Sequence, residues 1–199
     1  MKRAGRLRLG IFGGTFDPVH LGHLLLARDA LEQGRLDAVL FVPCAQSPLK
    51  SRRALASDAH RLAMLKAALR GEPRFWLSRC ELDRPGPSYS VDTAREIRAA
   101  FPHAQLFWLI GRDQWEQLDQ WRDPAELRRL VRFIRFPRGG AEPPSRARRN
   151  PRVLDLPHPR RVDISATEIR RRLKSRLPID HLVPDAVAAR IRRHRLYGS

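Results

Sequence analysis

Short apolar runs alternate with helix-patterned segments along most of this 199-residue chain, and this alternation restricts the possible folds more than any other feature. The apolar runs end at glycine, proline or polar residues, as buried strands do. The expected strands are Leu7 to Phe12, Ala38 to Pro43, Phe75 to Ser78, Gln105 to Ile110, Arg132 to Phe136 and Val153 to Leu156. The expected helices are Leu21 to Gln33, a helix capped by Asp58 with Leu62, Leu65 and Leu69 on its apolar face, Asp92 to Phe101, two short helices of which the second opens at Asp123-Pro124, Ser165 to Lys174, and Pro184 to Arg193.

Strands that alternate with helices predict the α/β class, with a parallel sheet covered by helices on both faces. Ligands of such sheets bind beyond the carboxyl ends of the strands, where the strand order reverses. The length suits one domain. We therefore expect a single domain over residues 1–199, with a small C-terminal helical part at 164–199 and a surface loop rich in Pro, Arg and Gly at 137–151.

The charge pattern raises a nucleic-acid-binding protein as an alternative of a different class. The formal net charge is +18, from 39 basic and 21 acidic residues, and a strongly basic balance attracts polyanions. However, 35 of the 39 basic residues are arginines spread along the chain, and no aromatic residues are interleaved with them for base stacking. We expect a basic surface that attracts anionic substrates, and no dedicated nucleic-acid partner.

Neither the apolar segments nor the two cysteines of this sequence indicate a membrane-spanning, secreted or disulfide-bonded protein. No apolar run approaches the roughly 18 to 20 residues that a membrane helix needs. The basic start, Met1 to Arg8, leads into an apolar stretch without a small-residue cleavage site, unlike a signal peptide. Cys44 and Cys80 have no disulfide or zinc spacing. We expect a cytoplasmic protein without membrane contact and with reduced, partly buried thiols, and homo-oligomerisation stays open.

The segment after the first expected strand suits a phosphate ligand. Its glycine pair, Gly13 and Gly14, lets backbone approach a phosphate closely. The helix that follows offers free N–H groups and a positive dipole end. His20 and His23 are three residues apart, share a helical face, and can both donate hydrogen bonds to phosphate oxygens. A plain strand–turn–helix with two structural histidines is the alternative when the glycine pair is taken alone.

A second segment of the same kind lies near the C-terminus. Ile164 to Arg170 opens a helix in which Ser165 and Glu168 have the spacing of a capping box. The same helix start can bind an anion, with Thr167 and Arg170 as further donors. Taken alone, the segment fits a simple cap equally well.

Together the two segments resemble the motifs of the nucleotidyltransferase superfamily, whose members have a Rossmann-like, doubly wound sheet. His20-Leu21-Gly22-His23 resembles the (H/T)-x-G-H motif, and Ile164 to Arg170 resembles the I-S-x-T-x-x-R motif that binds ATP phosphates. The resemblance implies that His20 and His23 are catalytic. It implies an ATP site formed by Gly13, Gly14, Thr15, Phe16, His20, His23, Gly111, Asp113, Ile164, Ser165, Thr167 and Arg170.

Further segments resemble bacterial nicotinate mononucleotide adenylyltransferase. Ser88 to Thr93 is similar to its S-Y-T-x-x-T stretch, Leu109 to Asp113 to its G-x-D strand end, and Ser47 to Lys50 to its P-P-H-K loop. The implied mononucleotide site consists of Lys50, Ser88, Tyr89, Thr93 and Trp121. Two positions depart from the pattern. Leu49 replaces a histidine, and Arg112 replaces a small residue, where its side chain would either crowd the adenosine side or close over the site until substrate arrives.

The implied reaction is attack of the 5′-phosphate of nicotinate mononucleotide on the α-phosphorus of ATP, which yields deamido-NAD and pyrophosphate. The attacking phosphate is largely a dianion at neutral pH and needs no base, so catalysis rests on positioning and charge stabilisation. Mg²⁺ is expected to arrive with ATP, because it favours substrate oxygens and water over an all-protein cage. The main rival within the superfamily is phosphopantetheine adenylyltransferase, which usually has threonine at the position of His20, and other small-molecule nucleotidyltransferases are further alternatives.

Overall fold

The computed structural model describes residues 6–46, 48, 54–136, 152–156, 160 and 163–198. In that part of the chain, six strands form one sheet in the order β3-β2-β1-β4-β5-β6, and every neighbouring pair is parallel. The strands are β1 (Arg8–Gly14), β2 (Ala38–Pro43), β3 (Phe75–Leu77), β4 (Gln105–Gly111), β5 (Arg132–Phe136) and β6 (Val153–Asp155). The expected parallel α/β sheet is confirmed, and its order reverses at β1.

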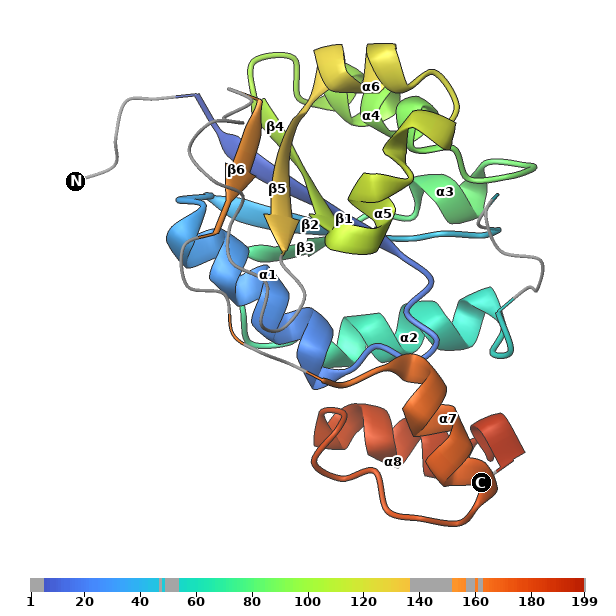
Figure 1. The fold of residues 1–199 in the computed structure, drawn as a ribbon. Helices are drawn as coiled ribbons and strands as arrows, with labels where there is room; N and C mark the ends of the chain where they lie inside the picture. Colours follow the sequence, from blue (N-terminus) through green and yellow to red (C-terminus); the bar gives the residue numbers. More distant parts are fainter. Residues whose placement is uncertain are drawn as a thin grey trace.

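Helices cover both faces of this sheet (Figure 1). They are α1 (Leu21–Gln33), α2 (Asp58–Ala68), α3 (Cys80–Asp83), α4 (Ser90–Ala100), α5 (Arg112–Glu116), α6 (Pro124–Leu130), α7 (Ala166–Lys174) and α8 (Asp185–Arg193), with short 3-10 turns η1 (Leu118–Gln120) and η3 (Leu196–Gly198). The helices α1, α2, α7 and α8 share one hydrophobic cluster with the sheet, whereas α4 and α6 share the other. The C-terminal helices thus pack on the same side as α1.

The central strand β1 is buried on both faces. Leu9 and Ile11 point into the cluster beneath α4 and α6, and Phe12 points into the cluster beneath α1. At Gly10 an added Cβ would lie 2.7 Å from Leu36 Cδ1, so a larger residue there would force the neighbouring side chains to shift. Burial on both faces explains why the strand reads as a continuous apolar run and not as an alternating one.

Local details differ from the expected elements. Ser57, not Asp58, caps α2, because the Ser57 hydroxyl accepts a hydrogen bond from the backbone N–H of His60 at 3.4 Å. Leu62 is only half-buried, while Arg61 takes a fully buried position on the same helix. The helix α4 begins at Ser90, two residues before the expected start, and the short helix α3 was not expected. The loop predicted at 137–151 lies outside the described residues.

Candidate active site

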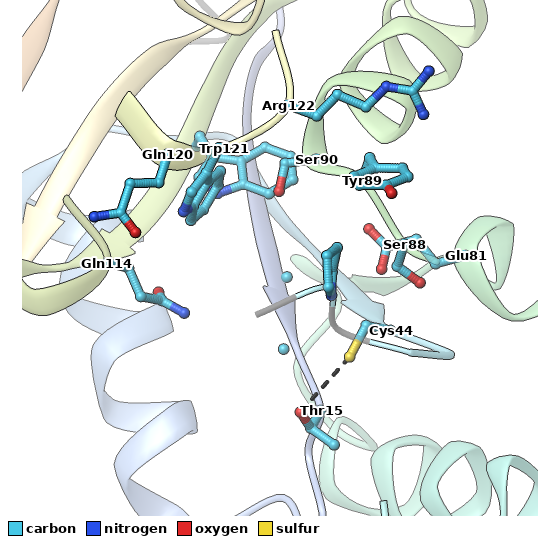
Figure 2. Close-up of a pocket in the computed structure, with 14 residues that line it drawn as sticks. Thr15, Cys44, Glu81, Ser88, Tyr89, Ser90, Gln114, Gln120, Trp121 and Arg122 are labelled. Atoms are coloured by element: carbon cyan, nitrogen blue, oxygen red, sulfur yellow. Dashed lines mark hydrogen bonds between the residues drawn. The ribbon is translucent and has the colours of Figure 1, made fainter. Parts of the chain in front are cut away.

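A cavity of about 160 Å³ opens at the carboxyl ends of β1, β2 and β4, where the strand order reverses (Figure 2). The predicted location of the ligand site at this edge therefore coincides with a hollow in the structure. The strand ends contribute Gly13, Gly14, Thr15, Cys44 and Trp108, and the surrounding loops and short helices contribute Pro48, Glu81, Ser88, Tyr89, Ser90, Gln114, Gln120, Trp121 and Arg122.

A buried arginine fixes the base of the segment between β1 and α1. Arg61 is fully buried, and its Nη1 donates to the carbonyl of Thr15 at 2.6 Å. Its Nη2 donates to the carbonyl of Cys44 at 2.7 Å and to Asp58 Oδ1 at 2.6 Å. These three bonds offset much of the cost of burying the charge, while the Nε of Arg61 has no hydrogen-bond partner among the described residues. Arg61 thereby joins the end of β1 to the end of β2 beneath the cavity.

Asp17 holds the same segment from another side. Its buried carboxylate accepts hydrogen bonds from the backbone N–H groups of Leu55 at 2.7 Å and Ala56 at 3.1 Å. The hydroxyl of Tyr197, on η3, donates to Asp17 Oδ1 at 2.6 Å. Burial and this neighbouring carboxylate raise the pKa of the Tyr197 hydroxyl, which keeps it a donor. The C-terminal turn is thus bonded directly to the segment that precedes the two histidines.

The two histidines lie together, as their spacing predicts. The rings of His20 and His23 stack with centroids 3.6 Å apart and planes at 28°. Burial lowers the pKa of His20 to about 4, so its ring is neutral at neutral pH. The backbone N–H of His20 donates to Nδ1 of His23 at 3.2 Å, which places the proton of a neutral His23 ring on Nε2. The pair therefore offers hydrogen-bond donors, and in His20 an uncharged one.

Two expectations about this segment need correction. The first helical N–H of α1, at Leu21, donates to the carbonyl of Leu182 at 2.9 Å and is not available to a phosphate. The side chain of Phe16 is buried in the core, with its ring 4.9 Å from that of His23. An added Cβ at Gly14 would lie 3.1 Å from the Phe16 ring. Gly14 therefore accommodates this aromatic ring, and the Phe16 side chain supports His23.

The second motif reaches the first through one arginine. Arg170, on α7, donates from Nη1 to the carbonyl of Asp17 at 2.7 Å and from Nη2 to Thr167 Oγ1 at 3.1 Å. Residues 153 positions apart are thereby placed side by side. Ser165 caps α7, since its hydroxyl accepts from the N–H of Glu168 at 3.1 Å.

Only one of the two hydrogen bonds of the expected capping box forms, which is the bond from the backbone N–H of Glu168 to the Ser165 hydroxyl. The carboxylate of Glu168 pairs with Arg171 at 2.8 and 2.9 Å instead of returning to the cap. Ser165 and Thr167 are exposed, whereas Ile164 is partly buried and packs against the core. The start of α7 is therefore accessible to solvent at Ser165 and Thr167, and Ile164 anchors it to the core.

The end of β4 carries the remaining predicted ATP contacts. At Gly111 no described heavy atom lies within 4 Å of an added Cβ, so the space beside this residue is open. Asp113 is exposed on α5. Arg112 forms an ion pair with Glu116 of its own helix at 2.9 Å. The Arg112 side chain is therefore held along α5 and does not close over the cavity.

The residues predicted to contact the acceptor differ in their position relative to the cavity. Ser88, Tyr89 and Trp121 line the cavity (Figure 2). Thr93 does not, because its side chain is fully buried behind the wall, where it donates to Glu81 Oε1 at 2.6 Å. Lys50 lies outside the described residues, as does Leu49. The buried Nε1 of Trp121 has no hydrogen-bond partner among the described residues.

Several residues of the site were not predicted from the sequence. Trp108 lines the cavity, and the ring of Trp121 lies edge-on to it with centroids 6.4 Å apart. Glu81 is buried at the cavity wall; burial raises the pKa of its carboxyl, and the hydrogen bond from Thr93 opposes that rise. The sequence does contain one indication that Arg61 is buried, because the spacing between Arg61 and the buried Met64 places both on one face of α2.

Comparisons with known proteins agree on one class. Residues 11–172 match the family model described as cytidylyltransferase-like. The chain is 39% identical over 192 residues to nicotinate-nucleotide adenylyltransferase of Bacillus subtilis, which covers 96% of this chain and 99% of that protein. It is 46% identical over 198 residues to a protein of Opitutus terrae named "Probable nicotinate-nucleotide adenylyltransferase", covering 96% and 98% of the two chains.

The fold is also found among solved structures. Nicotinic acid mononucleotide adenylyltransferase of Plasmodium falciparum, solved as a complex with NaAD, superposes with a TM-score of 0.73 at 18% identity, over 96% of this chain and 98% of that one. This likeness shows a shared Rossmann-like architecture. Within the described part of the chain, no helix has the length and apolar character needed to span a membrane.

Proposed function

This chain belongs to the cytidylyltransferase-like family and, within it, to the nicotinate-nucleotide adenylyltransferases, and we propose that it joins AMP from ATP to nicotinate mononucleotide. The observation that carries the proposal is the junction of the two motifs beside one cavity. Arg170 binds the carbonyl of Asp17, three residues before the stacked histidines, and the glycine pair at the end of β1 faces an aromatic-walled hollow. A triphosphate and a ring-bearing acceptor can meet at such a place.

The proposed chemistry is a single displacement. A 5′-phosphate oxygen of the mononucleotide forms a bond to the α-phosphorus of ATP, while the bond from that phosphorus to the β-bridging oxygen breaks and pyrophosphate leaves. His20 and His23 would donate hydrogen bonds to the reacting phosphates. A neutral His20 stabilises developing charge through its N–H dipole and gives up no proton, because its pKa is about 4. Ser165, Thr167 and Arg170 would hold the leaving β- and γ-phosphates.

A magnesium ion fits this site as a companion of ATP. The carboxylate that we assign to it is Asp113, which is exposed beside the open space at Gly111. One carboxylate together with phosphate oxygens and water is a donor set that Mg²⁺ favours. When bound, the ion would neutralise negative charge on the phosphates. Asp113 would meet the ATP ribose or a water held by that ion.

Recognition of the acceptor would use the opposite wall of the cavity. The first turn of α4 presents the backbone N–H groups of Ser90 and Val91, whereas those of Asp92 and Thr93 donate to the carbonyl of Tyr89. This positive helix end suits the ring carboxylate of nicotinate. Trp121 would stack on the pyridine ring. An amide in place of the carboxylate would turn its NH₂ group towards these donors, at a cost of about 1 to 3 kcal/mol.

The deciding experiment supplies ATP, Mg²⁺ and a panel of phosphorylated acceptors and measures pyrophosphate release. We expect kcat/KM for nicotinate mononucleotide to exceed that for nicotinamide mononucleotide by at least about tenfold. Equal values, or a preference for the amide, would refute the acceptor assignment and leave adenylyl transfer standing. Turnover with phosphopantetheine alone would favour the rival enzyme of the same superfamily.

A further inference from the structure

One side chain brings a permanent positive charge to the acceptor cavity. Arg122 lines this cavity, and none of the other described residues around it carries a cationic side chain. Glu81 is the only carboxylate among the same described residues. A ring carboxylate that enters the cavity leaves water, and N–H donors or a positive charge must offset the lost hydration. Arg122 can supply both, because a guanidinium carries several N–H donors and does not lose its proton.

Arg122 lies where the two segments assigned to the acceptor approach each other. It follows Trp121, the residue directly after η1, and its Cζ atom lies 4.6 Å from the centroid of the Tyr89 ring. Figure 2 shows the Arg122 side chain extending past Ser90 to a position above Tyr89. The guanidinium therefore lies beside the start of α4, where the N–H groups of Ser90 and Val91 have no helical carbonyl to bind.

The ion pair that Arg122 forms with the protein leaves its charge available to a ligand. Arg122 Nε lies 3.8 Å from Asp123 Oδ2, and both side chains are 54% exposed. Asp123 also pairs with Arg95, whose Nη2 lies 4.0 Å from the same oxygen. An exposed ion pair of this kind contributes little free energy, and the positive end of the α4 dipole adds to the charge of the guanidinium. Two positive features thus meet at one corner of the cavity, which favours an anionic group there.

We propose that Arg122 is a specificity-determining residue, which selects acceptors with a negatively charged ring substituent by placing its guanidinium beside that substituent. The proposal rests on the function proposed above and adds a residue to its acceptor site. The N–H groups of α4 favour a carboxylate through the polarity of their hydrogen bonds. Arg122 adds an attraction between full charges, which acts on the carboxylate of nicotinate and not on the neutral amide of nicotinamide.

The test measures binding as well as turnover. Trp108 and Trp121 line the cavity, so tryptophan fluorescence can report the binding of nicotinate and nicotinamide mononucleotides to each variant. Arg122→Gln removes the charge and keeps an amide donor, whereas Arg122→Lys keeps the charge without the planar guanidinium. Arg79→Gln is the matched control, because Arg79 is 57% exposed, forms a surface ion pair with Asp83 at 2.9 Å and is not among the residues that line the cavity.

The expected effect falls on one of the two mononucleotides. In Arg122→Gln, kcat/KM and the affinity for nicotinate mononucleotide should fall about tenfold, whereas both values for nicotinamide mononucleotide should stay within about twofold of the wild type. Arg122→Lys should keep most of the preference, and Arg79→Gln should keep all of it. Between about 0.05 M and about 0.5 M salt the preference of the wild type should decrease, because salt screens exposed charges, while that of Arg122→Gln should change little.

Equal losses for the two mononucleotides in Arg122→Gln would overturn the proposal and reduce Arg122 to a residue that only orders Tyr89. An unchanged preference in Arg122→Gln, or an equal loss of preference in Arg79→Gln, would overturn it as well, and each of these results leaves adenylyl transfer to nicotinate mononucleotide intact. If the wild type binds both mononucleotides and transfers AMP to neither, the proposed function fails, and the affinities still decide the role of Arg122. A wild type that binds neither mononucleotide would refute both proposals.

Discussion

Acidification to about pH 5 should destabilise this protein through His20, because the fold requires that ring to be uncharged. An unfolded chain titrates histidine near its ordinary pKa of 6.5, whereas burial lowers the pKa of His20 to about 4 in the folded protein. Between these two values the unfolded state binds the additional proton. The free energy of unfolding therefore rises with pH across this window, and the stabilisation is lost as pH falls from about 6.5 towards 4.

The size of the effect follows from the two pKa values. The shift of about 2.5 units corresponds to about 3.4 kcal/mol when the titration is complete, at 1.36 kcal/mol per unit. At pH 5 the unfolded His20 is almost fully protonated, whereas the folded ring is about one-tenth protonated. About 2 kcal/mol of stability, relative to pH 7.5, should therefore be lost at pH 5. His20 is only 6% exposed, so little of this is screened by solvent.

Urea unfolding of the wild type and of His20→Asn, at pH 7.5 and at pH 5, measures this contribution. Asparagine cannot take up the proton, so the variant should lose about 2 kcal/mol less than the wild type between the two conditions. His103→Gln is a suitable control, because His103 is an exposed histidine in the turn before β4, whereas the cavity lies at the carboxyl ends of the strands. If the wild type and His20→Asn lose stability in parallel, His20 is not the buried neutral ring described here.

Three further substitutions test the site. His20→Ala should lower kcat by about 10²-fold to 10³-fold with the fold retained, since it removes one donor to the reacting phosphates; near-normal turnover would exclude His20 from the mechanism. Trp121→Ala should raise KM for the mononucleotide and leave KM for ATP almost unchanged, and steady-state kinetics with each substrate varied in turn would show the reverse if Trp121 served ATP. Tyr197→Phe removes one bond to a buried carboxylate and should lower the free energy of unfolding by about 1 to 2 kcal/mol; an unchanged denaturation midpoint would mean that the bond between Tyr197 and Asp17 contributes nothing.

The sheet and most helices could be predicted because their signals are local. The bounds of α1, β2 and β5 agree with those expected, since each has a local signal: a glycine after α1, a proline at the end of β2 and a proline directly after β5. The short helix α3 was missed because four residues carry no helical period. The cap of α2 was misplaced by one residue, because serine and aspartate are both good caps and only the hydrogen bond to His60 distinguishes them.

The supporting residues of the site could not be predicted, because their roles depend on burial created by distant segments. Arg61 shares a helical face with the buried Met64, but its charge favours a solvated position, and only the bonds to Thr15 and Cys44 at the ends of β1 and β2 show why it is buried. The resemblance that pointed to Thr93 could not tell a residue that lines the cavity from one that stands behind its wall. Tyr197 lies 180 residues from Asp17 in the sequence, and no spacing rule relates positions that far apart.

The bond from Tyr197 to Asp17 also sets an order of events during protein synthesis. In the sheet, β2 and β3 lie on one side of β1 and β4, β5 and β6 lie on the other, so the strands of the first side are synthesised before those of the second. At about 5 to 20 residues per second, roughly ten to forty seconds separate the translation of Asp17 from that of Tyr197. A nascent chain could therefore assemble its sheet before the segment that precedes the two histidines is bonded to Tyr197. An unfinished copy would have the architecture of the enzyme without this support for the proposed ATP site.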